Sequence, residues 1–143
     1  MTSVVVDASV AMKWCLPSFR EELVAEAVEL LASSYREEIR FLVPDLFWVE
    51  IANALWKAVR RNEISSDSAD SAMSFMRDLD ISTVPSFDIV PEALGLAISQ
   101  GRTVYDSLYV ALAVQSKSQL ITADERLANA LAARFPVKWL GAF

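Results

Sequence analysis

The chain has 143 residues, of which 54% are hydrophobic and 22% charged, a composition that suits one folded domain and excludes a disordered chain. It contains no histidine and a single cysteine, which excludes Ser-His and Cys-His catalytic sites, histidine-ligated zinc and an internal disulfide. The formal net charge of −6 argues at first against nucleic-acid binding, because phosphate is bound largely by Lys and Arg.

Short β-branched or apolar segments alternate with helix-length amphipathic segments. In the first half of the chain we expect strands over residues 4–6 and 41–43, and helices over 21–34, from 44–45 to about 61, and over 65–80. Pro44 suits the beginning of its helix, because the first turn needs no N–H donor at that position.

The second half repeats this alternation. We expect strands over residues 81–84, 119–121 and 137–140, and helices over 91–100, 103–115 and 123–134. Gly101 ends the first of these helices. Residues 107–114 are apolar on nearly every side, so the helix at 103–115 is expected to be central and buried.

Strands that are separated by helices pair in parallel through right-handed crossovers. The sequence therefore predicts one α/β domain over residues 1–143, with an open sheet and many helices. In such sheets the functional residues gather where the strands end, at their carboxyl ends. The acidic residues at these positions are the first candidates for a site.

Two acids follow predicted strands. Asp7 comes directly after the strand at 4–6, and Asp124 follows the strand at 119–121 after two residues. Each also has a structural interpretation, Asp7 as a turn residue or N-cap, and Asp124 as part of a first helical turn. Thr122 and Glu125 have capping-box spacing around Asp124.

Two further acids belong to predicted helices. Asp106 opens the buried helix, with Thr103 at capping spacing, and a carboxylate there needs donors, a cation or a proton. Glu50 shares a polar stripe of its helix with Asn53, Lys57 and Arg60, with Arg61 at the edge. This stripe is either an ordinary solvated face or the wall of a polar cleft.

Together the four acids suggest a metal site. Acids at strand ends and at the start of a buried helix are expected to converge on one edge of a parallel sheet. Carboxylates within about 4–6 Å of one another raise each other's pKa unless a cation neutralises them. Oxygen ligands without histidine or cysteine select a hard divalent ion, so we expect Mg²⁺ or Mn²⁺.

Four segments, in this order, resemble VapC-type toxins of the PIN-domain family: VVVDAS at 4–9, Glu50 after Pro44 and Asp45, YDSLYVALA at 105–113, and ITADERL at 121–127. The resemblance covers essentially the whole chain. It implies a three-layer fold with a central, mostly parallel sheet of about five strands flanked by helices. It also implies an endoribonuclease that cleaves RNA phosphodiester bonds with one or two Mg²⁺ or Mn²⁺ ions.

The resemblance places the catalytic and metal-binding functions on Asp7, Glu50, Asp106 and Asp124. We expect Asp7 and Asp106 to bind metal directly. Glu50 and Asp124 are expected to bind a second ion or to act through water. The expected reaction is in-line attack by a metal-activated water that expels the 3′ oxygen and leaves a 5′ phosphate. Ser107 stands where the family often has Ala, and it affects none of these acids.

Further residues are expected to support the reaction. Thr122 and Ser9 match hydroxyl-bearing and small polar positions of the family and would orient carboxylates or waters. A rim of basic residues is expected to hold RNA: Lys13, Lys57, Arg60, Arg61 and Arg102. Of these, Lys13 and Arg102 are the substrate-binding candidates, and ordinary surface charge is the alternative for each.

Partners follow from the same resemblance. VapC-type proteins usually form homodimers and bind a small antitoxin whose C-terminal segment enters the active-site groove, so we expect both here. Some of the aromatic residues of the first half are expected in an interface: Trp14, Phe19, Phe47, Trp48 and Trp56. Two alternatives remain, a stand-alone PIN nuclease in RNA processing and a non-catalytic RNA- or protein-binding module on the same fold.

The chain carries no recognisable targeting segment. Its first residues lack the basic region of a secretory signal, and no segment has the ~20 uncharged apolar residues of a membrane span. With a single cysteine, these features predict a cytoplasmic protein without a membrane partner.

Overall fold

The computed structural model describes residues 1–16 and 22–143. Two sequence expectations reach beyond them: Phe19 and the first residue of the expected helix, Glu21, lie outside the described residues. The rest of that helix is found as α2, Val24–Tyr35, which begins after Leu23.

A single parallel sheet forms the centre of the molecule, as predicted. Its strand order is β3-β2-β1-β4-β5, and every pair of neighbours is parallel. All five expected strands are present, with ends that differ from the expected ones by at most two residues: β1 Thr2–Val6, β2 Ile39–Pro44, β3 Ile81–Val84, β4 Gln119–Thr122 and β5 Val137–Trp139. The order puts β1 and β4 side by side, so the residues that follow them, Asp7 and Asp124, reach the same edge.

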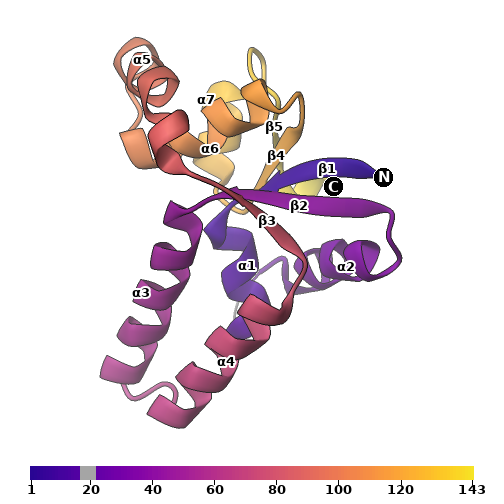
Figure 1. Cartoon of the computed structure of the whole chain (residues 1–143), viewed down its shortest axis with the longest axis vertical. Helices are drawn as coiled ribbons and strands as arrows, with labels where there is room; N and C mark the ends of the chain where they lie inside the picture. Colours follow the sequence, from indigo (N-terminus) through magenta and orange to yellow (C-terminus); the bar gives the residue numbers. More distant parts are fainter. Residues whose placement is uncertain (17–21) are drawn as a thin grey trace.

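Helices lie on both faces of the sheet and complete the expected three layers (Figure 1). On one side are α1 Ala8–Cys15, α2, α3 Leu46–Arg60 and α4 Ser66–Asp78, and on the other are α5 Val90–Gln100, α6 Val104–Gln115 and α7 Glu125–Leu131. Short 3₁₀ turns occur at Ser86–Asp88 and Leu140–Ala142. None of the helices within the described residues is both long and apolar enough to cross a membrane.

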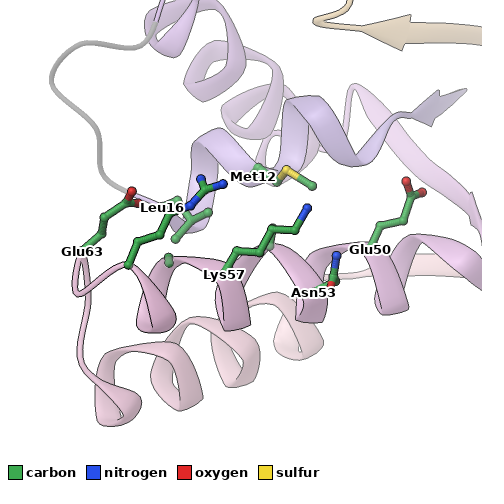
Figure 2. A pocket seen from close by; sticks show the side chains of 9 residues that line it. Met12, Leu16, Glu50, Asn53, Lys57 and Glu63 are labelled. Atoms are coloured by element: carbon green, nitrogen blue, oxygen red, sulfur yellow. The ribbon is translucent and has the colours of Figure 1, made fainter.

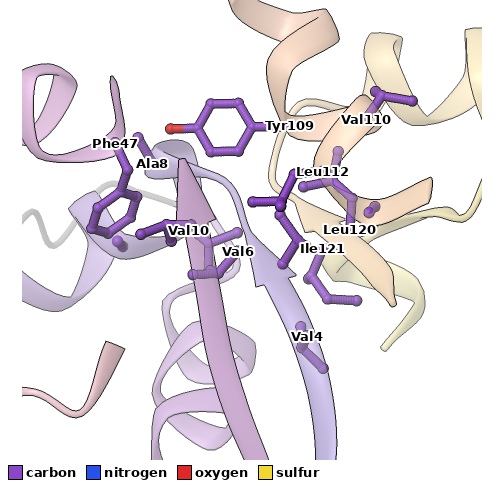
Figure 3. Packing of buried hydrophobic residues seen from close by; sticks show 14 of the residues in the cluster. Val4, Val6, Ala8, Val10, Phe47, Tyr109, Val110, Leu112, Leu120 and Ile121 are labelled. Carbon is purple, nitrogen blue, oxygen red and sulfur yellow. The ribbon is translucent and has the colours of Figure 1, made fainter. Parts of the chain in front are cut away.

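The helix expected to be central, α6, is buried. Seven consecutive residues from Ser107 to Ala113 are buried, and the helix packs against β1, β2, β4 and α5. Figure 3 shows Leu112 of α6 beside Ile121 of β4. A helix that is covered on every side needs no polar stripe, which explains its uniformly apolar sequence.

Helix α1 occupies residues for which the sequence predicts no element. It has eight residues and begins directly after Asp7, and Ala8, Val10 and Ala11 are buried. Two turns give too few repeats for the helical period to stand out beside an apolar strand. The expected helix at 123–134 is also shorter than predicted, because Asp124 caps α7 and the helix ends at Leu131.

Two glycines of α5 allow a matched test of this description. Gly101 ends the helix with φ +67°, a backbone conformation that is strained for a residue with a side chain. Gly95 lies inside the helix, and a Cβ added there would have no other atom within 4 Å. We expect Gly101→Ala to lower the free energy of unfolding by about 1 kcal/mol. Gly95→Ala should raise it by about 0.5–1 kcal/mol. Chemical denaturation measures both, and a stabilising Gly101→Ala would contradict the assigned backbone conformation.

Candidate active site

The four predicted acids come together where the strands end. Asp7 follows β1, Asp124 follows β4, Asp106 lies in the first turn of α6 and Glu50 lies in α3. They form one electrostatic group: the charge of Asp106 raises the pKa of both Asp7 and Glu50, and Asp124 raises that of Asp106. Their convergence is a property of the tertiary structure, since α3 and α6 are far apart in sequence.

Asp7 accepts hydrogen bonds from two hydroxyls, one at the end of β4 and one in the first turn of α1. Thr122 Oγ1 donates to Asp7 Oδ2 at 2.7 Å, and Ser9 Oγ donates to the same oxygen at 3.1 Å. Each hydroxyl oxygen in turn accepts a backbone N–H, from Asp124 at 3.0 Å and from Ala123 at 3.1 Å. A hydroxyl that already accepts an N–H directs its only proton elsewhere, here to Asp7.

Burial nevertheless raises the pKa of Asp7 above its ordinary value. The hydroxyls of Thr122 and Ser9 and the Ser9 backbone N–H lower the pKa, and the neighbouring Asp106 raises it again. The donors therefore offset only part of the cost of burying this charge. A carboxylate whose pKa is raised in this way is typical of functional sites, and a bound cation stabilises its charged form.

Tyr109 is a residue of this site that the sequence analysis does not assign. Its hydroxyl donates to Glu50 Oε1 at 2.6 Å, and the side chain is only 2% exposed. Figure 3 shows this hydroxyl directed toward the side of the molecule on which Phe47 and Ala8 lie. Burial, together with the charges of Asp7 and Glu50, raises the pKa of Tyr109 far above its ordinary value, so the phenol remains a donor.

Glu50 is affected by the same surroundings. Burial is the main cause that raises its pKa, the charges of Asp7 and Asp106 add to the effect, and the hydrogen bond from Tyr109 opposes it. One sequence signal could have found this contact. Tyr109 follows Asp106 by three residues on α6, a spacing that places both side chains on the same side of a helix.

Asp106 is positioned by the start of α6 and by one cation. Its backbone N–H donates to Thr103 Oγ1 at 3.1 Å, which confirms the predicted cap. Arg102 Nη2 lies 3.6 Å from Asp106 Oδ2. Burial raises the pKa of Asp106 and Arg102 lowers it. Within the part of the chain that the structure describes, the buried Arg102 Nε has no hydrogen-bond partner.

Asp124 also caps a helix. Its Oδ1 accepts the backbone N–H groups of Arg126 at 3.0 Å and Leu127 at 3.2 Å. The expected capping box between Thr122 and Glu125 is therefore wrong, because Asp124 is the N-cap and the Thr122 hydroxyl is used by Asp7. The cap engages one oxygen of Asp124, and the other has no donor among the described residues.

The donor set suits a hard divalent cation. The contacts above engage Oε1 of Glu50 and Oδ2 of Asp106, and no donor to the second oxygen of either group is described. The one ion pair that the described residues make to the four acids is that of Arg102. Residues 1–16 and 22–143 contain no group of three or more Asp, Glu, Cys or His placed to hold an ion. Because Mg²⁺ keeps several waters and takes one or two protein carboxylates, the residues fit an ion bound partly through water.

A groove of about 410 Å³ begins at Glu50 and runs between α1 and α3 (Figure 2). Asn53, Lys57 and Arg61 line it, so most of the predicted polar stripe of α3 is the wall of a cleft. Arg60 is different, since its guanidinium lies 5.3 Å from the centre of the Trp56 ring. Lys13 lies in the last turn of α1, and its contact with RNA stays a prediction.

Known proteins resemble this chain in sequence and in fold. Residues 4–131 match the PIN domain. Ribonuclease VapC3 of Pyrobaculum aerophilum is 35% identical over 129 residues, which cover 87% of this chain and 92% of the relative. The fold is shared with a crystal structure from Pyrobaculum aerophilum, with TM-score 0.70, 22% identity and coverage of 99% of this chain and 85% of that one. It is shared too with a toxin-antitoxin complex from Klebsiella pneumoniae, with TM-score 0.62, 15% identity and coverage of 94% and 95%.

The raised pKa of Asp7 predicts how the stability of the fold depends on pH. Because the pKa of Asp7 is raised on folding, the ionised group destabilises the metal-free fold once the pH exceeds its unfolded value. Asp7→Asn should therefore raise the unfolding midpoint in EDTA at pH 7, and this advantage should shrink as the pH falls toward 4. Asp7→Ala should be less stable than Asp7→Asn by about 1–3 kcal/mol, since two hydroxyls lose their acceptor. A lower midpoint for Asp7→Asn at pH 7 would contradict this account.

Proposed function

The chain belongs to the PIN-domain family, and from this membership we propose that it is a metal-dependent endoribonuclease, the toxin of a toxin–antitoxin pair. The observation that carries the proposal is the group of four interacting carboxylates at the carboxyl edge of the sheet. The ribonuclease VapC3, which shares 35% of its aligned residues with this chain, supports the same activity.

The chain's own residues divide the tasks of this reaction. Asp7 and Asp106 would hold Mg²⁺ or Mn²⁺ directly, and Glu50 and Asp124 would hold a second ion or waters. When bound, such an ion supplies positive charge to the scissile phosphate and lowers the pKa of a water. Thr122 and Ser9 would orient Asp7 and favour its ionised form.

Tyr109 would restrict Glu50 to one orientation by binding its Oε1. The other carboxylate oxygen, Oε2, would then be left for an ion or a water. Because the chain has no histidine, protons must be exchanged by carboxylates or water. The carboxylates of this site are partly withdrawn from solvent, and electrostatic interactions there are stronger than in water.

The catalytic assignment predicts a loss of activity without a loss of fold. Asp7→Asn and Asp106→Asn should each abolish Mg²⁺-dependent cleavage of single-stranded RNA, because each removes a negative metal ligand and keeps the shape of the side chain. Asp78→Asn is the matched control, because Asp78 is exposed and precedes β3, at the opposite edge of the sheet. RNA cleavage is followed on a gel, and circular dichroism monitors the fold. Cleavage by Asp106→Asn at the parent's rate would refute the assignment.

We also propose that the chain forms a homodimer and binds a small antitoxin. Of the aromatic residues expected in an interface, Phe47 is buried, Trp14 donates to the Ala27 carbonyl at 2.7 Å, and Trp56 is 54% exposed. A second exposed apolar surface supports the dimer. It is a stripe on α5, one residue per helical turn: Val90, Leu94 and Ile98. The Klebsiella pneumoniae toxin-antitoxin complex, which has the same fold, supports the antitoxin.

The dimer proposal is tested by light scattering after size-exclusion chromatography. The parent should elute with twice its chain mass of 15.8 kDa. Leu94→Glu with Ile98→Glu should shift it to the monomer, because both exposed apolar side chains would become charged. Ser99→Glu, also exposed on α5, is the control for added charge. A parent that remains a monomer at high concentration would contradict the proposal.

A further inference from the structure

The groove between α1 and α3 has a defined direction. It is lined by Asn53 and Lys57 of α3 and by Arg61, which caps the end of that helix. Figure 2 shows Glu50 and Glu63 at its opposite ends, with Lys57 and Asn53 between them. One end therefore lies at a carboxylate of the candidate active site. Along α3, Lys57 lies seven residues, about 10 Å, from Glu50. The groove continues the catalytic edge and is not a separate cavity.

Among the residues that the structure describes, the two cations of this groove have no side-chain partner. Neither Lys57 nor Arg61 forms an ion pair or side-chain hydrogen bond with any residue that the structure describes. Two other basic residues are engaged: Arg36 binds Glu29 and Glu38, and Arg102 binds Asp106. In a chain of net charge −6, unpaired cations that share one polar groove indicate an anionic ligand.

The spacing of these cations suits a chain of anions better than a single one. Lys57 lies in the last turn of α3 and Arg61 caps that helix four residues later, so the two side chains follow one another along the same side of the helix. At the end away from the active site, the groove is bordered by Glu63, whose carboxylate would repel a further phosphate. The positive part of the groove is therefore short and extends from the active site.

We propose that this groove binds the sugar-phosphate backbone of the RNA strand beside the bond to be cut, with Lys57 and Arg61 each contacting one phosphate. The proposal rests on the proposed function and names the subsite through which that function holds its substrate. Met12 of α1 and Leu16, which follows that helix, give the groove an apolar wall, against which a ribose or base can pack. Lys57 and Arg61 are substrate-positioning residues, because they contact the strand away from the reacting atoms.

This assignment predicts a specific kinetic and binding signature. The double variant Lys57→Gln with Arg61→Gln should raise KM for a single-stranded oligoribonucleotide about tenfold or more and leave kcat within about twofold, because charged contacts to the strand are lost. In the Asp106→Asn background, where the oligonucleotide stays intact, its affinity should fall by a similar factor. The slope of log K against log salt should decrease in magnitude by about 1.4, since each phosphate contact on a single strand contributes about 0.7.

The matched control removes the same charge from elsewhere. Arg40→Gln with Lys117→Gln changes two exposed cations, in β2 and before β4, on the side of the sheet opposite the strand ends. It should leave KM, affinity and the salt slope unchanged. An equal effect of both double variants would overturn the proposal that the groove binds RNA, because the loss of net charge alone would then explain the weaker binding.

The alternative occupant is a protein segment, and the same variants distinguish it. If the groove variant binds the oligonucleotide as the parent does but no longer binds the cognate antitoxin, the groove takes protein and the proposal is wrong. Absence of cleavage by the parent would contradict the proposed nuclease function. The Asp106→Asn binding measurement still decides whether the groove takes RNA in that case.

Discussion

The partial burial of the Asp7 carboxylate, where β1 and β4 end side by side, is the constraint on which the site depends. Charge in this position is unfavourable unless donors face it, and one of its two hydroxyl donors, Thr122, lies more than a hundred residues later in the chain, whereas the other, Ser9, is two residues away. The pairing of β1 with β4 brings Thr122 to Asp7, and two backbone N–H groups of the following loop hold both hydroxyls in their donor orientation. The geometry of the active site in this protein therefore depends directly on the register between β1 and β4.

The negative net charge is compatible with RNA binding once the charges are placed. Four of the acids form one group at the sheet edge, where their mutual repulsion favours a divalent cation. Such an ion, held by these carboxylates, would supply positive charge for a phosphate, so the acids would contribute to substrate binding through it. Lys57 and Arg61 line the groove that begins at one of these acids, Glu50. Net charge averages over these regions and describes neither of them.

The fold was predictable because its signals are local. Apolar strands of four to six residues, helices of eleven to fifteen and a turn glycine identify most elements without tertiary information. Helix α1 lacked such a signal, since it is short and joins β1 through one residue. The capping box expected at Thr122 does not form, because that hydroxyl binds the Asp7 carboxylate and Asp124 caps the helix instead.

The sequence by itself determined the α/β class, the parallel sheet, the buried central helix and the acidic residue types of the site. These follow from periodicity and composition, which depend only on neighbours along the chain. The tertiary structure alone decided the contact between Tyr109 and Glu50 and the groove that begins at Glu50. These features require α3 to lie against α1 and close to α6, and the distance between helices depends on how the whole core packs. No local pattern specifies it.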